Sequence, residues 1–345
     1  QYVWQNVNND YAVRNNINNS WIIDTGLTNE FEYQQNVLGL YSTAAIEKNK
    51  VGLKGGLRLE NTLLQTLLTT TNEENNRNFN NLFPSLHFSY KLNNHLGFQF
   101  GYSKRIYRPR LWDLNPFFNI RDNYNIRTGN PNLLPEFTDA FEISSILTKD
   151  KVSVNMSIYK RITEGVIERL STFENNVTTY VPYNVGKKDA TGIELNTKIN
   201  ANKQISLLGD FNYFQFKRTG EFNNQNIDFS AQQWYTKWTT KLKLTSTTDV
   251  ELSGQYESGY LTIQGEIQPQ LYGNIGFRQK LINGKAVISF SIRDLFASRI
   301  WVNEIIQNDF SLYSRSFRGR FIIFGFSYGF GKGEAMEYSG ARRYF

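Results

Sequence analysis

The sequence contains no cysteine, only two histidines and no long apolar run. Without cysteine, disulfide scaffolds, thiolate zinc sites, iron–sulfur clusters and cysteine nucleophiles are excluded. His87 and His95 leave little for histidine-based catalysis or for a metal site. No stretch approaches the roughly 20 consecutive apolar residues of a membrane-spanning helix, which excludes helical membrane proteins. We therefore expect no enzyme, no metal and no cofactor.

Aromatic side chains are abundant in a chain that is otherwise polar. They make up 15% of the 345 residues, although the mean hydropathy is only −0.49. The net charge of +7 comes from 38 basic and 31 acidic residues that are scattered along the chain. Because nucleic-acid binding requires a basic face, we do not expect nucleic acid as a partner.

Apolar and polar residues alternate strictly in many segments. In the last of them, Phe324, Phe326, Tyr328 and Phe330 fall on one face, while glycine and serine occupy most positions between them. A period of two residues gives a β-strand one apolar and one polar face. The sequence therefore predicts an all-β protein.

The connections between these segments are of two kinds, which alternate along the chain. Short polar turns, such as residues 47–50, 93–94 and 148–151, follow long irregular stretches, such as residues 108–136. Short turns on one rim and long loops on the other are typical of a transmembrane antiparallel β-barrel, with the short turns in the periplasm and the long loops outside. Fourteen strands are expected, over residues 2–14, 29–46, 51–66, 80–92, 95–107, 137–148, 151–166, 179–200, 204–218, 231–246, 249–261, 269–282, 285–299 and 317–331.

This architecture explains the composition. A closed barrel pairs every backbone polar group within the membrane, and its apolar side chains face lipid while small polar ones face the lumen. We expect residues 1–331 to form an outer-membrane β-barrel and residues 332–345 a periplasmic tail. Outer-membrane lipid and lipopolysaccharide are then partners, the latter through lysines and arginines near the rims.

Residues 80–147 carry an ordered series of short motifs. In chain order they are Asn81-Leu82-Phe83-Pro84-Ser85-Leu86, Tyr102-Ser103-Lys104-Arg105-Ile106-Tyr107-Arg108-Pro109, Leu114-Asn115-Pro116-Phe117, Thr128-Gly129-Asn130-Pro131-Asn132-Leu133 and Pro135-Glu136-Phe137-Thr138. This series resembles the barrel of TonB-dependent receptors, in the outer membrane protein β-barrel family common in Bacteroidota. The resemblance runs from about residue 29 to residue 331.

The resemblance implies a receptor that imports a scarce nutrient such as a siderophore, glycan or peptide. Such receptors have a plugged barrel of about 22 strands, so this chain would be the C-terminal part of a larger barrel. The implied partners are the barrel-insertion machinery, a TonB-type energy-coupling complex and surface lipoproteins. The alternative is a plugless barrel that serves as a structural subunit of an outer-membrane assembly or secretion complex, or as a passive pore.

The long 108–136 connection contains the candidate ligand-binding residues. Planar cations, amides and aromatic rings, the groups that grip a sugar, a chelate or a phosphate, are mixed there. The alternative, which the recurrence of the motif among receptors of different ligands favours, is that its prolines stiffen a loop that packs into the barrel mouth. The candidate residues are Arg108, Arg110, Trp112, Asp113, Asn115, Phe117 and Phe118.

The final strand is the candidate membrane-insertion segment. The family resemblance suggests that the barrel-insertion machinery reads residues 317–331, and the apolar face ending at Phe330 is consistent with that role. The residues assigned to it are Phe324, Phe326, Tyr328 and Phe330.

Overall fold

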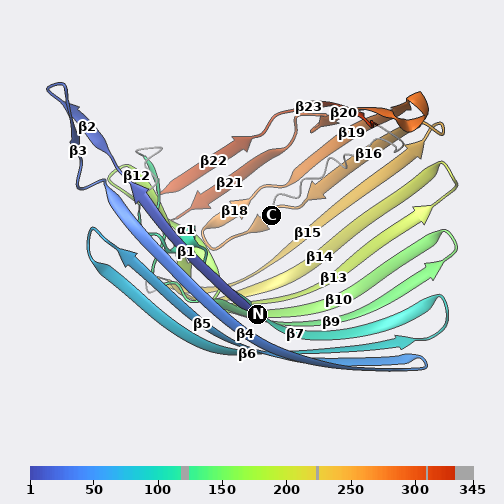
Figure 1. Ribbon diagram of the computed structural model, residues 1–345, viewed down its shortest axis with the longest axis horizontal. Helices are drawn as coiled ribbons and strands as arrows, with labels where there is room; N and C mark the ends of the chain where they lie inside the picture. Colours follow the sequence, from blue (N-terminus) through green and yellow to red (C-terminus); the bar gives the residue numbers. More distant parts are fainter. Residues whose placement is uncertain (118–123, 223–224, 308–309, 331–345) are drawn as a thin grey trace.

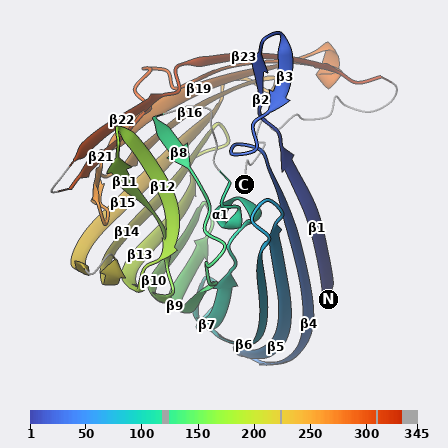
Figure 2. The ribbon, with the colours of Figure 1, turned by 90° about the vertical axis from the view of Figure 1, so that its left-hand side faces the viewer.

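The computed structural model describes residues 1–117, 124–222, 225–307 and 310–330. One antiparallel sheet of 14 strands dominates the molecule and curves into a trough (Figures 1 and 2). The number and order of the wall strands predicted from the alternation are confirmed. In spatial order the strands are β1 (Tyr2–Tyr11), β4 (Asn29–Lys48), β5 (Val51–Leu68), β6 (Glu73–Lys91), β7 (Leu96–Tyr107), β9 (Glu136–Lys149), β10 (Val152–Glu164), β13 (Lys187–Asn200), β14 (Ile205–Phe222), β15 (Gln225–Lys243), β16 (Thr248–Glu257), β19 (Gln270–Leu281), β20 (Ala286–Arg293) and β23 (Phe321–Tyr328).

The two faces of the sheet differ as the alternation predicts. On β5, Leu59 is 51% exposed on the convex face, whereas the next residue, Glu60, is 3% exposed on the concave face. The paired strand β4 repeats this pattern, with Leu38 exposed and Val37 buried. The convex face therefore presents apolar side chains to lipid, and the concave face is the lumenal one.

On the convex face, the band of apolar side chains that faces lipid is bordered by a row of ion pairs. Its members occupy neighbouring strands from β7 to β15, on the side of the long loops. Beyond this row the outward side chains of β13 to β15 are polar, among them Lys187, Thr219 and Asn226, so these strands project from the membrane there. The pairs are Lys104–Asp139 (3.7 Å), Lys160–Asp189 (3.2 Å) and Lys217–Asp228 (2.9 Å).

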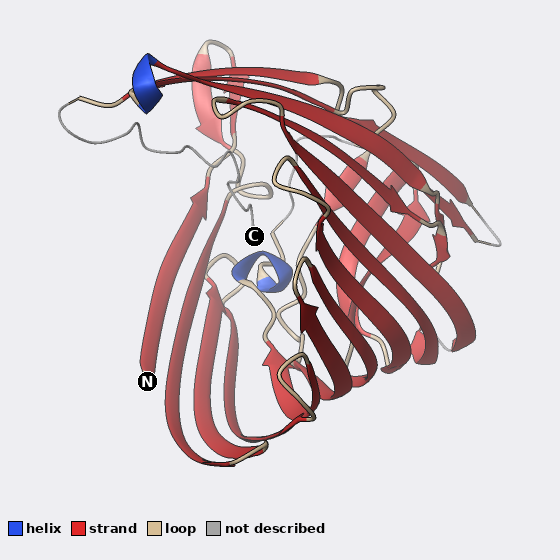
Figure 3. Ribbon diagram, turned by 90° about the vertical axis from the view of Figure 1, so that its right-hand side faces the viewer, coloured by secondary structure: helices blue, strands red, loops and turns tan. Residues whose placement is uncertain are grey.

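The long connections contain strands of their own. They form a hairpin, a three-stranded sheet and a four-stranded sheet beside the main wall. Helix within the described residues is confined to α1 (Leu111–Leu114) and the 3-10 turn η1 (Ile282–Gly284), as Figure 3 shows. The added strands are β2 (Arg14–Ile17), β3 (Ser20–Ile23), β8 (Asn125–Arg127), β11 (Ile167–Glu174), β12 (Val177–Asn184), β17 (Tyr260–Leu261), β18 (Gly265–Ile267), β21 (Ile300–Ile306) and β22 (Ser311–Phe317).

The prediction of one continuous strand over residues 179–200 is wrong. The chain leaves the extracellular strand β12 at Asn184 and enters the wall strand β13 at Lys187. Gly186 lies between them with a φ of +53°, a left-handed conformation that glycine adopts without the cost of a Cβ atom. Similarly, Asp294 (φ 53°) ends β20 at Arg293, well short of the predicted residue 299.

The wall has two edges, β1 and β23. Within the described residues these two strands do not pair with each other, so the sheet is open along both. In the same described part of the chain, no α-helix is long and apolar enough to cross a bilayer.

Candidate functional site

The described parts of the 108–135 connection, residues 108–117 and 124–135, fold back onto the lumenal face of the wall. Arg108, directly after β7, hydrogen-bonds the carboxylate of Glu60 on β5 and the hydroxyl of Thr62 at 3.2 Å. Glu60 also pairs with Arg58, so two guanidinium groups neutralise one buried carboxylate. Figure 2 shows α1 on the concave side of the sheet, and this ion pair holds the start of the loop there.

A small apolar core holds further described residues of the connection. Leu114 of α1 is fully buried, and Leu133 lies beside it with 1% exposed. Both leucines pack against apolar side chains on the lumenal face of β4 and β5. The alternation pattern predicts polar side chains on that face. Their wall partners are Phe31, Tyr33, Leu64 and Leu68.

Besides Arg108, two more of the predicted ligand residues have polar partners within the protein. Asp113 accepts hydrogen bonds from the Arg110 backbone amide (3.1 Å) and from the Arg169 guanidinium on β11 (3.1 Å). Asn115 is buried, and its side-chain oxygen accepts the amide of Phe117 at 2.9 Å. These contacts stabilise the loop itself.

The remaining candidates are placed differently. Trp112 is 67% exposed, and Arg110 is exposed beside it. The Phe117 ring lies 4.8 Å from the Tyr11 ring of β1. Phe118 lies outside the described residues. In the structure, Arg108 contacts the barrel wall, and Asp113 and Asn115 contact other loop residues. A ligand-binding role for the seven candidate residues stays a prediction.

A second group of charges joins the β11–β12 hairpin to the wall at the mouth. Arg218 of β14 hydrogen-bonds Glu168 of β11, and Glu136 accepts the amide of Ile167 at 2.5 Å. Burial raises the pKa of Glu136, and burial lowers the pKa of the neighbouring Lys188. The Lys188 ammonium lies 4.5 Å from the centre of the Phe216 ring, a cation–π contact.

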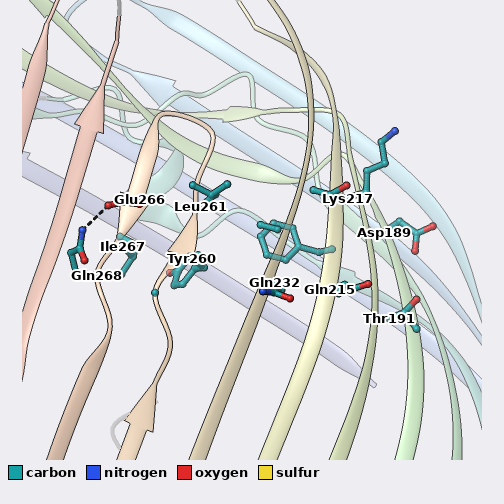
Figure 4. A pocket seen from close by; sticks show the side chains of 14 residues that line it. Asp189, Thr191, Gln215, Lys217, Gln232, Tyr260, Leu261, Glu266, Ile267 and Gln268 are labelled. Carbon is teal, nitrogen blue, oxygen red and sulfur yellow. Dashed lines mark hydrogen bonds between the residues drawn. The ribbon is translucent and has the colours of Figure 1, made fainter.

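A cavity of about 780 Å³ opens between the outer ends of β13–β15 and the β17–β18 hairpin (Figure 4). Asp189 and Lys217 lie at one end of it and Glu266 and Gln268 at the other, with Tyr260 between them. Gln268 donates to Glu266 at 2.6 Å. The lining therefore offers hydrogen-bond donors and acceptors, and it contains side chains of positive and of negative charge. Sequence reasoning missed this cavity because its residues come from five separate strands.

Comparison with known proteins agrees with the fold. The model of the outer membrane protein beta-barrel family matches residues 1–328. A search of curated protein sequences finds no significant match. Among solved structures, the ferric yersiniabactin uptake receptor FyuA from Yersinia pestis superposes with a TM-score of 0.62 at 13% identity, over 94% of this chain and 50% of FyuA.

Two further receptors show the same likeness. The ferric citrate transporter FecA gives a TM-score of 0.64 at 11% identity, over 93% of this chain and 49% of FecA. The siderophore receptor PiuA from Acinetobacter baumannii gives 0.62 at 14% identity, over 86% and 43%. The chain thus spans about half the length of the receptors it resembles.

Proposed function

Because this chain belongs to the outer membrane protein beta-barrel family, we propose that it forms part of the barrel wall of a receptor that takes up a scarce solute across the bacterial outer membrane. The resemblance to the barrels of TonB-dependent receptors, predicted from the sequence motifs, is confirmed at the level of family and fold. The proposed role is binding and translocation, without a catalytic step.

The docking of the described parts of the 108–135 loop is the observation that carries this proposal. A passive pore requires an open lumen, whereas Arg108 and Leu114 hold this loop against the lumenal wall. A fixed structure at the mouth suits a receptor, because it can present exposed side chains such as Trp112 to a solute arriving from outside.

The open edges of the sheet support a larger barrel. Within hydrocarbon, unpaired backbone groups along β1 and β23 would each cost several kcal/mol. We infer that further strands cover these edges, as the half-length match to FyuA and FecA suggests. A plug within the full barrel and a TonB-type complex acting on it belong to the same proposal.

The solute and the other partners follow from the relatives and from the outer wall. The names of FyuA and FecA describe uptake of ferric chelates, which favours a metal chelate over a glycan or a peptide. The lysines in the row of outward ion pairs, at the upper border of the apolar band, lie where lipopolysaccharide phosphates would meet the wall. Surface lipoproteins and the barrel-insertion machinery complete the proposed partners.

The intact mass of the mature protein from its native outer membrane tests the proposal. A mass about twice the 40.1 kDa of this chain supports a plugged receptor. A mass near 40.1 kDa would contradict it and favour a plugless structural subunit or pore. Accumulation of radioactive iron chelates by cells then tests uptake, which should stop when a protonophore removes the energy source.

A further inference from the structure

A second cavity, of about 510 Å³, lies at the extracellular ends of β16 and β19, beside β21 and β22. Gln270 and Glu257 face each other across these two strands and belong to its lining. The next residue, Leu271, is 54% exposed on the apolar convex face. The alternation therefore directs Gln270 and Glu257 to the lumenal side, within reach of an incoming solute.

The lining of this cavity is strongly cationic. Three arginines from distant parts of the chain converge there, one each from β8, from the segment after β20 and from the segment after β22. Glu257 is the only carboxylate among the lining residues, so the charge balance within the cavity is +2. The lining consists of Arg127, Glu257, Gln270, Arg299, Trp301, Ser314, Ser316 and Arg318.

Nearby acidic groups are occupied with other partners. Asp294 is buried and accepts the backbone amides of Ser298 (2.9 Å) and Arg299 (3.2 Å). Glu257 accepts the side-chain amide of Gln233 at 3.1 Å. Within the described parts of the chain, no ion pair involves Arg127, Arg299 or Arg318.

Aromatic rings orient two of these guanidinium groups. Arg299 lies 4.6 Å from the centre of the Tyr272 ring, and Arg127 lies 5.7 Å from that of Tyr180. Such stacking leaves the N–H edges of a planar guanidinium free to donate. Because both arginines are held by rings and not by carboxylates, their positive charge remains available.

We propose that this cavity binds a multiply charged anion, with carboxylate or phosphate groups held by the three arginines. Arginine matches both groups through paired N–H donors, and the hydroxyls of Ser314 and Ser316 add further donors. This inference rests on the proposed uptake function and names its substrate class: the receptor takes up an anionic solute.

Calorimetric titration of the complete mature protein in detergent tests the site. Tricarballylate and pyrophosphate serve as the carboxylate and phosphate probes, and sucrose as a neutral probe. We expect at least one anion to bind, with an affinity that falls as salt rises, and sucrose not to bind at this site. Binding of neither anion at low salt would overturn the proposal.

Paired variants locate the binding. Arg299→Gln and Arg318→Gln should each weaken the anion affinity about 10-fold or more, in line with the loss of a charge-assisted hydrogen bond. Arg315→Gln is the matched control, since it removes the same charge from β22 at a position outside the cavity lining. An equal loss in the control would mean general charge attraction and would contradict the site.

The same titration separates this inference from the proposed function. Anion binding by a protein that fails to accumulate solute in cells would overturn uptake and leave the site standing. Energy-dependent uptake of a neutral solute, without anion binding, would overturn the site and leave the receptor function standing.

Discussion

Arg108, the first residue after β7, hydrogen-bonds Glu60 on the lumenal face of β5, 48 residues away in the chain. Glu60 stands between two guanidinium groups, those of Arg58 and Arg108, and is almost completely buried. The contact joins the base of the mouth loop to the barrel wall, so this part of the attachment depends on a single carboxylate.

Replacement of this carboxylate should loosen the base of the loop. Glu60→Ala leaves the Arg58 and Arg108 guanidinium groups together without a counter-charge. Because these side chains are 40% and 22% exposed, we expect a cost below the roughly 3–5 kcal/mol that the loss of one partner of a fully buried pair causes. We expect faster proteolysis within residues 108–135 and a lower free energy of unfolding. Glu47→Ala, at the exposed pair with Lys91 (2.9 Å), is the control and should change neither.

Two residues of α1, Leu114 and Trp112, separate loop stability from ligand binding. Leu114→Ala removes a fully buried side chain and should cost about 2–5 kcal/mol, measured as faster amide exchange in the loop. Trp112→Ala removes an exposed ring and should leave exchange unchanged. If the predicted ligand role is right, Trp112→Ala nevertheless weakens solute binding; unchanged binding in this variant would contradict that role.

The wall of the barrel was predictable because its signal is local. Alternation such as that of Phe324, Phe326 and Tyr328 depends only on which face of a strand meets lipid. The small extracellular sheets were not predictable in the same way. β8 pairs with β12 through Asn125–Thr178, and β18 pairs with β21 through Gly265–Ile305, contacts between distant segments without a sequence pattern of their own.

The contacts of the candidate residues could not be predicted from the sequence. The motif residues marked the 108–136 connection as a loop that packs into the barrel mouth, and its described parts contact the lumenal wall. However, Arg108 and Asp113 find their partners on β5 and β11, and nothing in the sequence pairs Glu60 with Arg108 or Arg169 with Asp113. The arginine-lined cavity was missed because Arg127, Arg299 and Arg318 meet only through the fold.

Gly186, where the chain passes from β12 into β13, should not tolerate a side chain. A Cβ atom there would lie 1.9 Å from the carbonyl oxygen of Thr219, and its φ of +53° is unfavourable for alanine by about 1–2 kcal/mol before any clash. We expect Gly186→Ala to lower the unfolding midpoint in urea. Gly55→Ala on β5 is the matched control, because no atom lies within 4 Å of its Cβ position, and an equal loss in both variants would contradict this account.

The last strand should be essential for insertion. β23 is an edge strand whose outward rings are exposed, including Phe324 and Phe326. Truncation at Ser316 removes this strand and should abolish assembly into the outer membrane, measured by fractionation and heat-modifiable migration on gels. Phe324→Ser with Phe326→Ser should reduce assembly, whereas Ser327→Ala on the opposite face should not. Normal insertion of the truncated chain would disprove the assignment.

The attachment of the β11–β12 hairpin should weaken as the pH rises above the usual pKa of a glutamic acid. Glu136 lies at the extracellular end of β9, beyond the ion pair of Lys104 with Asp139 (3.7 Å) that marks the edge of the apolar band. Burial raises its pKa above the usual 4.5, Glu168 raises it further, and the Ile167 amide, Arg218 and Lys188 oppose the rise.

The direction of the effect follows from proton binding. A raised pKa means that the folded protein binds the proton more tightly than the unfolded chain, so protonation stabilises the fold. This contribution is complete below pH 4.5 and is lost as the pH rises through the higher pKa of the folded state. Glu136→Gln is neutral throughout, so the difference in unfolding midpoint between this variant and the wild type should change across that interval. A difference that is constant with pH would show that Glu136 titrates alike in the folded and unfolded states.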